Sequence, residues 1–225
     1  MRVFAPQGEP RGVAYCWDGQ NLFGDGEELA GWHMDEILEE RAAQGRFAPV
    51  VVAIDHGGRQ RIGDYAPWPH SRFRRAGRAG ALLDWVVGEL KPFVDRELGP
   101  TPREATLVCG SSMGGLLSLY AWLRHPDVFG RAIAMSPSLW YSPQALFDTI
   151  ASFQPAPADS RVWMDIGKRE SSKWARQLLA SVGSALVARG LPEDRLAQVV
   201  DPNGRHHESS WSKRLPDALD FVGQD

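Results

Sequence analysis

Cysteine and long apolar stretches are scarce in this chain, and each absence excludes a class of protein. The two cysteines, Cys16 and Cys109, each lie in an apolar run, so we expect buried thiols in a reducing compartment. Neither has cysteine or histidine neighbours at zinc-ligand spacing, so we expect no metal site. No apolar run is long enough to span a bilayer, and the N-terminus lacks the apolar region of a signal peptide. The sequence therefore predicts a cytoplasmic protein that does not bind membranes.

Strong net charge is absent as well. A formal charge of −3 gives no general attraction to nucleic acid. Arginines gather only between Arg59 and Arg78, where acidic, proline and glycine residues interrupt them; we expect a solvated loop with some helix there in preference to a phosphate-binding patch. The 225 residues suit one domain of the larger α/β type, covering 1–225, with a core large enough to be stable unaided.

Strand-like apolar runs alternate with stretches of helical spacing. Strands are expected at 12–17, 49–54, 107–109, 131–135, 162–166 and 196–200. Helices are expected at 32–43, 79–98, after residue 112, at 171–189 and at 217–222, and Pro92 predicts a kink or break in the second of them. This alternation predicts an α/β fold, with a mainly parallel sheet covered by helices on both faces.

One strand-to-helix junction carries the sequence Gly110-Ser111-Ser112-Met113-Gly114. Gly-x-Ser-x-Gly alone also arises by chance in Gly/Ser-rich turns, but here an apolar strand precedes it and a helical run follows. In a nucleophile elbow, a sharp turn exposes the serine oxygen and the glycines let the backbone pack closely. The amides at the start of the helix then face any negative charge that develops beside the serine. Ser112 is therefore the candidate nucleophile.

Polar residues follow the expected strands at one and the same end. They occupy 18–21, 55–58, 136–138, 167–170 and 201–208, besides Ser112 itself. Ligands of parallel α/β sheets bind outside the carboxyl ends of the strands, so these residues are expected to converge on one rim.

The base that would activate Ser112 is expected to be a histidine later in the chain. His206 and His207 occupy the loop after the last expected strand, where a hydrolase places its base. His125 is more typical of a helix end, and the other histidines precede the serine.

An acid is expected between the serine and the histidine, where it would hold the imidazole in one tautomer. Glu170 lies in the loop just beyond the strand at 162–166 and has the better placement. Asp165, inside that strand, remains an alternative, and Asp201 is a third.

The chain also resembles a known family. The resemblance is carried by residues 17–23, 31–35, 51–58, 64–68, 110–115, 136–140 and 206–211, in the family's order. Together these segments are similar to the "putative esterase" family of α/β-hydrolases, which contains esterase D, enterochelin esterases, feruloyl esterases and mycolyltransferases. The enterochelin-esterase-like branch is the most similar.

The resemblance implies a role for several positions. Ser112 matches the nucleophile and Glu170 the acid of a Gly-x-x-Glu loop. His206 matches the base, because the family pattern is His-Asn-Glu-x-x-Trp and His207 stands where asparagine is usual. The oxyanion hole would use the backbone amides of Met113 and Gln20. Trp140 and Tyr141 match pocket residues, and Trp68 is a further candidate because aromatic side chains are frequent near this rim.

The chain also departs from the family's pattern. It begins at what resembles the second strand, so the N-terminal strand is expected to be missing or shortened, and no insertion is long enough for a lid domain. An open, shallow site is therefore expected. The sequence predicts a serine carboxylic-ester hydrolase that acts on a small or medium ester through an acyl-enzyme and needs no cofactor. An acyltransferase with the same triad and a non-catalytic binding protein remain alternatives, and neither the natural ester nor the oligomeric state follows from the sequence.

Overall fold

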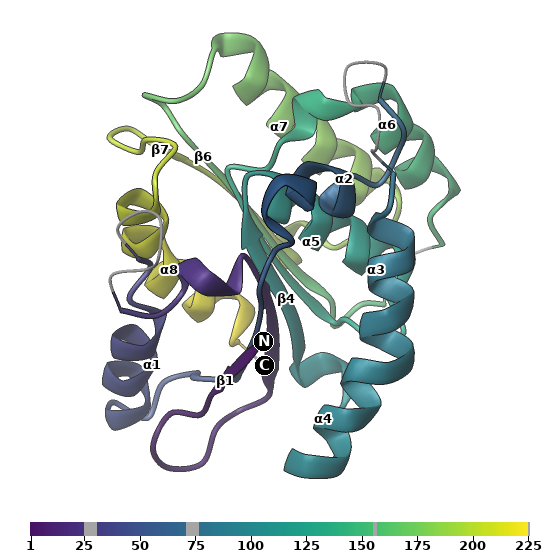
Figure 1. The fold of residues 1–225 in the computed structure, drawn as a ribbon. Coiled ribbons are helices and arrows are strands. Elements are labelled where there is room, and N and C mark those ends of the chain that lie inside the picture. The colour runs from purple at the N-terminus through teal and green to yellow at the C-terminus, as the bar shows by residue number, and fades with distance from the viewer. Residues whose placement is uncertain (25–30, 71–76, 155–156, 225) are drawn as a thin grey trace.

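The computed structural model describes residues 1–24, 31–70, 77–154 and 157–224, which form a seven-stranded sheet between two layers of helices (Figure 1). The sheet order is β1-β3-β2-β4-β5-β6-β7. β1 pairs antiparallel with β3, and the other neighbouring strands pair in parallel. The strands are β1 (Arg2–Phe4), β2 (Val13–Trp17), β3 (Val50–Ile54), β4 (Thr106–Ser111), β5 (Arg131–Met135), β6 (Arg161–Gly167) and β7 (Leu196–Asp201). The α/β fold expected from the sequence is confirmed.

The central strands are buried on both sides because helices cover both faces of the sheet. On one face, α1 and α8 pack over a core that includes Cys16, Leu38 and Leu215. On the other face, α3 to α7 cover a core that includes Trp17, Leu83 and Leu117 (Figure 1). The helices are α1 (Met34–Ala43), α2 (Arg61–Tyr65), α3 (Ala79–Trp85), α4 (Lys91–Leu98), α5 (Met113–Arg124), α6 (Pro143–Ser152), α7 (Lys173–Ala188) and α8 (Glu208–Val222).

The strand order places a switch point between β2 and β4. From β2 the chain crosses to β3 on one side, and then to β4 on the opposite side of β2. The connections that leave the carboxyl ends of β2 and β4 therefore diverge, which opens a crevice at the sheet edge. The short helix η1 (Gly19–Asn21) follows β2 there, and Ser112 follows β4.

Three elements differ from the sequence-based expectation. β1 was not among the strands placed by apolar runs, because three residues are too few to show an alternating pattern; the expectation of a missing or shortened N-terminal strand allowed for it. Around Pro92 the helix does not break: a π-helical turn, η3 (Val86–Leu90), joins α3 to α4. The Lys91 amide donates to the Val86 carbonyl five residues back, so the hydrogen-bond pattern changes just before Pro92, which has no N–H. α8 begins at Glu208, well before residue 217, and includes Pro216.

The arginine-rich segment from Arg59 to Arg78 falls partly outside the described residues, since 71–76 are not among them. In the described part, Arg61 pairs with Asp18 and Arg78 with Asp64. Among the described helices, none has both the length and the apolar character needed to cross a membrane.

Candidate active site

Ser112 occupies the tight turn between β4 and α5. Its backbone has φ 56° and ψ −120°, a conformation that L-residues adopt only under constraint and that costs about 1–3 kcal/mol. Close packing supplies the constraint: a Cβ on Gly110 would stand 2.7 Å from Trp17 Cδ1, and a Cβ on Gly115 would stand 2.8 Å from the Met135 carbonyl oxygen. The Ser112 amide donates to that same carbonyl at 2.9 Å. The turn therefore presents the serine hydroxyl at the sheet edge, as the motif predicts.

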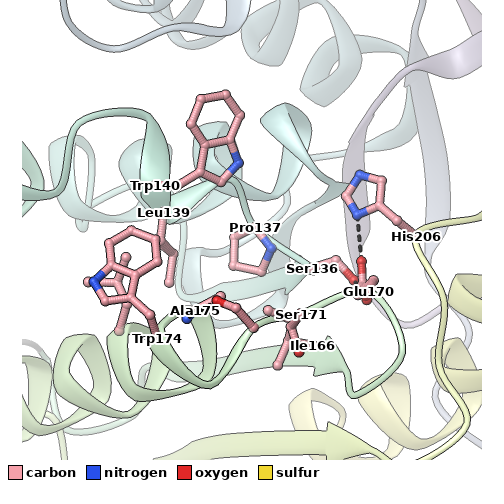
Figure 2. A pocket seen from close by; sticks show the side chains of 12 residues that line it. Ser136, Pro137, Leu139, Trp140, Ile166, Glu170, Ser171, Trp174, Ala175 and His206 are labelled. Atoms are coloured by element: carbon pink, nitrogen blue, oxygen red, sulfur yellow. Dashed lines mark hydrogen bonds and ion pairs between the residues drawn. The ribbon is translucent and has the colours of Figure 1, made fainter.

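The structure brings Ser112, His206 and Glu170 together from three separate loops. His206 Nε2 lies 3.0 Å from Ser112 Oγ, and His206 Nδ1 lies 2.5 Å from Glu170 Oε2. Figure 2 shows the imidazole above the carboxylate, with the second contact dashed. The His206 side chain is 48% exposed, whereas Glu170 is only 5% exposed. The candidate base is thus half exposed, and it contacts a buried carboxylate.

The contacts of Glu170 favour its ionised form. Besides the imidazole, it accepts hydrogen bonds from Ser136 Oγ and the Gly167 amide, each at 2.6 Å. Burial acts to raise the pKa of Glu170, but the hydrogen bonds from His206, Ser136 and Gly167 outweigh it and lower the pKa below its usual range. A carboxylate held in this way can orient His206 and stabilise its protonated form.

The two alternative acids face other partners. Asp165 is fully buried and accepts from Arg214 at 2.9 Å, Trp163 at 2.8 Å and the Ser136 amide at 3.1 Å. Burial raises its pKa in spite of these hydrogen bonds. Asp201 accepts from the Asn203 amide and Arg214. Of the three acids, only Glu170 contacts the imidazole.

Three residues contact the triad, or support it through Ser136, in ways that the sequence did not predict. Ser136 Oγ donates to Glu170 and accepts from Trp211 Nε1 at 2.9 Å and Arg214 Nη2 at 3.0 Å. The Trp211 ring stands edge-on to His206, with centroids 5.0 Å apart. The family segments include Ser136 and Trp211, but nothing in the sequence distinguishes Arg214 from other helix arginines, because its role depends on burial.

The candidate oxyanion donors lie at the switch point. Met113 begins α5, and Gln20 lies in η1, directly after β2. Within the described residues, neither backbone amide donates to another group. The Gln20 side chain accepts from the His56 amide at 3.1 Å, which ties η1 to the loop after β3. Both amides therefore lack a hydrogen-bond acceptor among the described residues.

An apolar cleft of about 340 Å³ adjoins His206 and Glu170. Trp140 and Trp174, about half exposed, lie toward its other end (Figure 2). Two of the three expected pocket residues lie elsewhere. Tyr141 is buried against His70, and Trp68 packs edge-on to Tyr120; neither lines this cleft. These two rings pack against other side chains away from the cleft. Trp174, which belongs to no motif in the sequence, lines the cleft instead.

His207 and His125 lie at helix ends. His207 is the N-cap of α8, where its ring accepts from the Ser209 amide at 3.2 Å. His125 ends α5. Across the described residues, no group of histidine, cysteine and acidic side chains could hold a metal ion.

Comparison with known proteins identifies the family. A family model described as "Putative esterase" matches residues 2–222. The chain belongs to this family. It is thus a carboxylic ester hydrolase of the α/β-hydrolase fold, and the resemblance seen in the sequence is confirmed.

Among curated relatives, the "Uncharacterized protein YbbA" of Bacillus subtilis is 30% identical over 93% of this esterase and 84% of its own length. The siderophore triacetylfusarinine C esterase of Aspergillus fumigatus is 29% identical over 64% of this chain and 50% of its own. The iron(III) salmochelin esterase of Escherichia coli is 26% identical over 64% of this chain and 33% of its own length. The chain therefore spans half or less of the length of these two siderophore esterases.

Solved structures share the fold. An IroE-like serine hydrolase from Shewanella oneidensis superposes with a TM-score of 0.75 at 20% identity, covering 98% of this esterase and 74% of that chain. The enterobactin esterase of Shigella flexneri, solved in the presence of enterobactin, gives 0.75 at 22% identity and covers 98% of this chain and 53% of its own.

Proposed function

We propose that this esterase hydrolyses a small-molecule ester through a Ser112–His206–Glu170 triad and an acyl-enzyme. The continuous contact from Glu170 through both ring nitrogens of His206 to Ser112 Oγ carries the proposal. Family membership supplies the reaction class, and the siderophore esterases among its relatives act, by their names, on small-molecule esters.

Each residue has a defined task in the proposed mechanism. His206 Nε2 takes the proton from Ser112 as the serine oxygen attacks the ester carbonyl. The amides of Gln20 and Met113 stabilise the oxyanion, and loss of one such donor typically lowers turnover about a hundred- to a thousandfold. His206 then protonates the leaving alcohol, and a water molecule activated by the same nitrogen releases the acid. Glu170 stays ionised and holds the imidazolium.

Acyl transfer to an alcohol would use the same acyl-enzyme. The half-exposed ring of His206 lets water reach the base, as hydrolysis requires, and an alcohol acceptor would reach it by the same route. A cytoplasmic location stays a prediction that follows from the buried free thiols of Cys16 and Cys109.

Labelling with a fluorophosphonate tests the proposal. Stoichiometric attachment to Ser112, mapped by peptide mass spectrometry, together with loss of 4-nitrophenyl butyrate hydrolysis, is the expected result. Attachment elsewhere, or full activity after labelling, would contradict it. Product analysis with an added alcohol acceptor separates hydrolysis from transfer.

A further inference from the structure

A second cleft, of about 240 Å³, has Ser112 and His206 in its wall. We refer to it as the polar cleft. Unlike the apolar cleft, it is lined mainly by hydrogen-bonding and ionisable side chains. Besides Ser112 and His206 its lining residues are Asp18, Asn21, Trp32, His56, Arg61, Ser111, Glu208 and Trp211.

Arg61 and Asp18 form an ion pair with each other in the polar cleft. Arg61 Nε and Nη2 donate to the two carboxylate oxygens of Asp18, at 2.5 and 2.7 Å. This bidentate geometry pairs the two charges through the Nε–Nη2 edge of the guanidinium, whose face lies over the Tyr65 ring. The pair therefore adds no net charge to the cleft.

Glu208 has no such bidentate partner among the described residues, although its charge interacts with that of Arg61. It is 5% exposed, and its Oε2 atom is buried without a hydrogen-bond donor among the described residues. Asn21 is 9% exposed, and its Oδ1 atom is likewise buried without a donor. Buried acceptors without donors are costly, so a ligand that brings N–H groups would be stabilised here. The lining holds two carboxylates, those of Asp18 and Glu208, and one guanidinium, that of Arg61, so carboxylates are in excess by one.

Aromatic rings complete the wall. Trp32 and Trp211, both nearly buried, line the same cleft with ring centroids 6.0 Å apart. Indole faces attract cations through their quadrupole, and the attraction grows when the cation is desolvated. A carboxylate acceptor beside two indoles is suited to an alkylammonium group and unsuited to an anion.

We propose that the polar cleft is a subsite for a protonated primary amine carried by the ester substrate. This inference rests on the proposed hydrolysis at Ser112 and adds a substrate feature to it. The ammonium would donate to Glu208 Oε2 and Asn21 Oδ1 and pack against Trp32 or Trp211, while the ester carbonyl lies at Ser112.

Two pairs of rigid esters test the subsite on either half of the substrate. The acyl pair is 4-nitrophenyl 4-(aminomethyl)benzoate and 4-nitrophenyl 4-ethylbenzoate. The alcohol pair is 4-(aminomethyl)phenyl butyrate and 4-ethylphenyl butyrate. Within each pair the shapes match and only the ammonium differs. Dividing each ratio of kcat/KM by the ratio of hydroxide-catalysed rates removes the intrinsic reactivity of the esters.

In the wild type we expect a corrected preference for the ammonium ester of about tenfold or more in one of the two pairs, the size of a charge-assisted hydrogen bond. Glu208→Gln should bring that ratio close to one. The matched control is Asp217→Asn, which removes one negative charge from the exposed face of the same helix and should leave the ratio unchanged.

The wild-type ratios test the proposal even if Glu208→Gln does not fold. If both ratios are near one while 4-nitrophenyl butyrate is still hydrolysed, the buried acceptors hold water only. That result would overturn the subsite but leave the proposed hydrolysis standing. A preference that survives in Glu208→Gln would also overturn it. Failure to hydrolyse any of the five esters would instead contradict the proposed function.

Discussion

The hydroxyl of Ser136 donates to Glu170 Oε1 across 2.6 Å, on the side of the carboxylate away from His206. The same oxygen accepts from Trp211 and Arg214, so one atom connects the acid to two side chains of α8. His206 and Glu170 are therefore held by the packing of α8 against β5 and β6 as well as by their own loops. This connection explains how a half-exposed histidine can keep a fixed orientation.

Ser136→Ala should lower kcat about tenfold while leaving KM for a short ester nearly unchanged. It removes a donor from Glu170 and leaves Trp211 Nε1 and one Arg214 contact without their acceptor, which costs about 1–3 kcal/mol of folding stability. Steady-state kinetics and urea unfolding measure the two effects. An unchanged kcat would show that Ser136 does not position the acid.

His206→Ala and His207→Ala should differ sharply in activity. Loss of His206 removes the only ring in contact with Ser112 Oγ among the described residues, and losing a triad base costs roughly 10⁴- to 10⁶-fold in kcat. His207 caps α8, so its substitution should cost about 1 kcal/mol of stability and leave most of the activity. The reverse pattern would contradict the assignment of the base.

Glu170→Gln and Asp165→Asn should separate activity from stability. An amide at 170 cannot stabilise the imidazolium, so kcat should fall roughly 10³- to 10⁴-fold. An amide at 165 removes the nearest of the three carboxylates that pair with Arg214, and should cost up to about 3 kcal/mol of stability. Comparing kcat with the urea midpoint in each variant checks the assignment. A larger loss of kcat in Asp165→Asn would make Asp165 the acid.

Glu170 should also make folding stability depend on pH. Burial raises its pKa, but the hydrogen bonds from His206, Ser136 and Gly167 lower it below the unfolded value. A lowered folded-state pKa stabilises the protein above the unfolded value of about 4.3, and this contribution disappears as the pH falls through the folded value. The difference in unfolding free energy between wild type and Glu170→Gln should therefore shrink from about pH 5 to about pH 3. A difference that stays constant over urea titrations in this range would be inconsistent with the lowered pKa.

Gly115→Ala should destabilise the elbow. The new Cβ would stand 2.8 Å from the Met135 carbonyl oxygen and 3.2 Å from Pro137 Cα, both backbone atoms, so about 1–3 kcal/mol of strain is expected. Gly88→Ala is the control, because its Cβ meets nothing within 4 Å, and removing a helical glycine should stabilise the protein by roughly 0.5–1 kcal/mol. Thermal unfolding of both variants tests the contrast; equal shifts would show that the elbow relaxes.

The sequence predicts the sheet and its helices because buried parallel strands form continuous apolar runs, as at Val50–Ile54. The Gly-x-Ser-x-Gly motif at a strand-to-helix junction points to Ser112. Chain order points to His206 and His207, and the family resemblance chooses His206. What the sequence does not reveal depends on tertiary packing. Arg214 resembles any helix arginine until burial places it beside Asp165, and Tyr141 resembles a pocket residue until its ring is buried. Periodicity also misplaces the start of α8, because Pro216 interrupts the pattern that begins at Glu208.

The switch point between β2 and β4 has a consequence for how this esterase can diversify. Gln20 and Met113, the proposed oxyanion donors, follow two neighbouring, hydrogen-bonded strands and would act through main-chain groups, which do not depend on side-chain identity. The two clefts, in contrast, are built from side chains on loops and helices. Point mutations in the clefts can therefore change substrate preference while the proposed main-chain donors are kept.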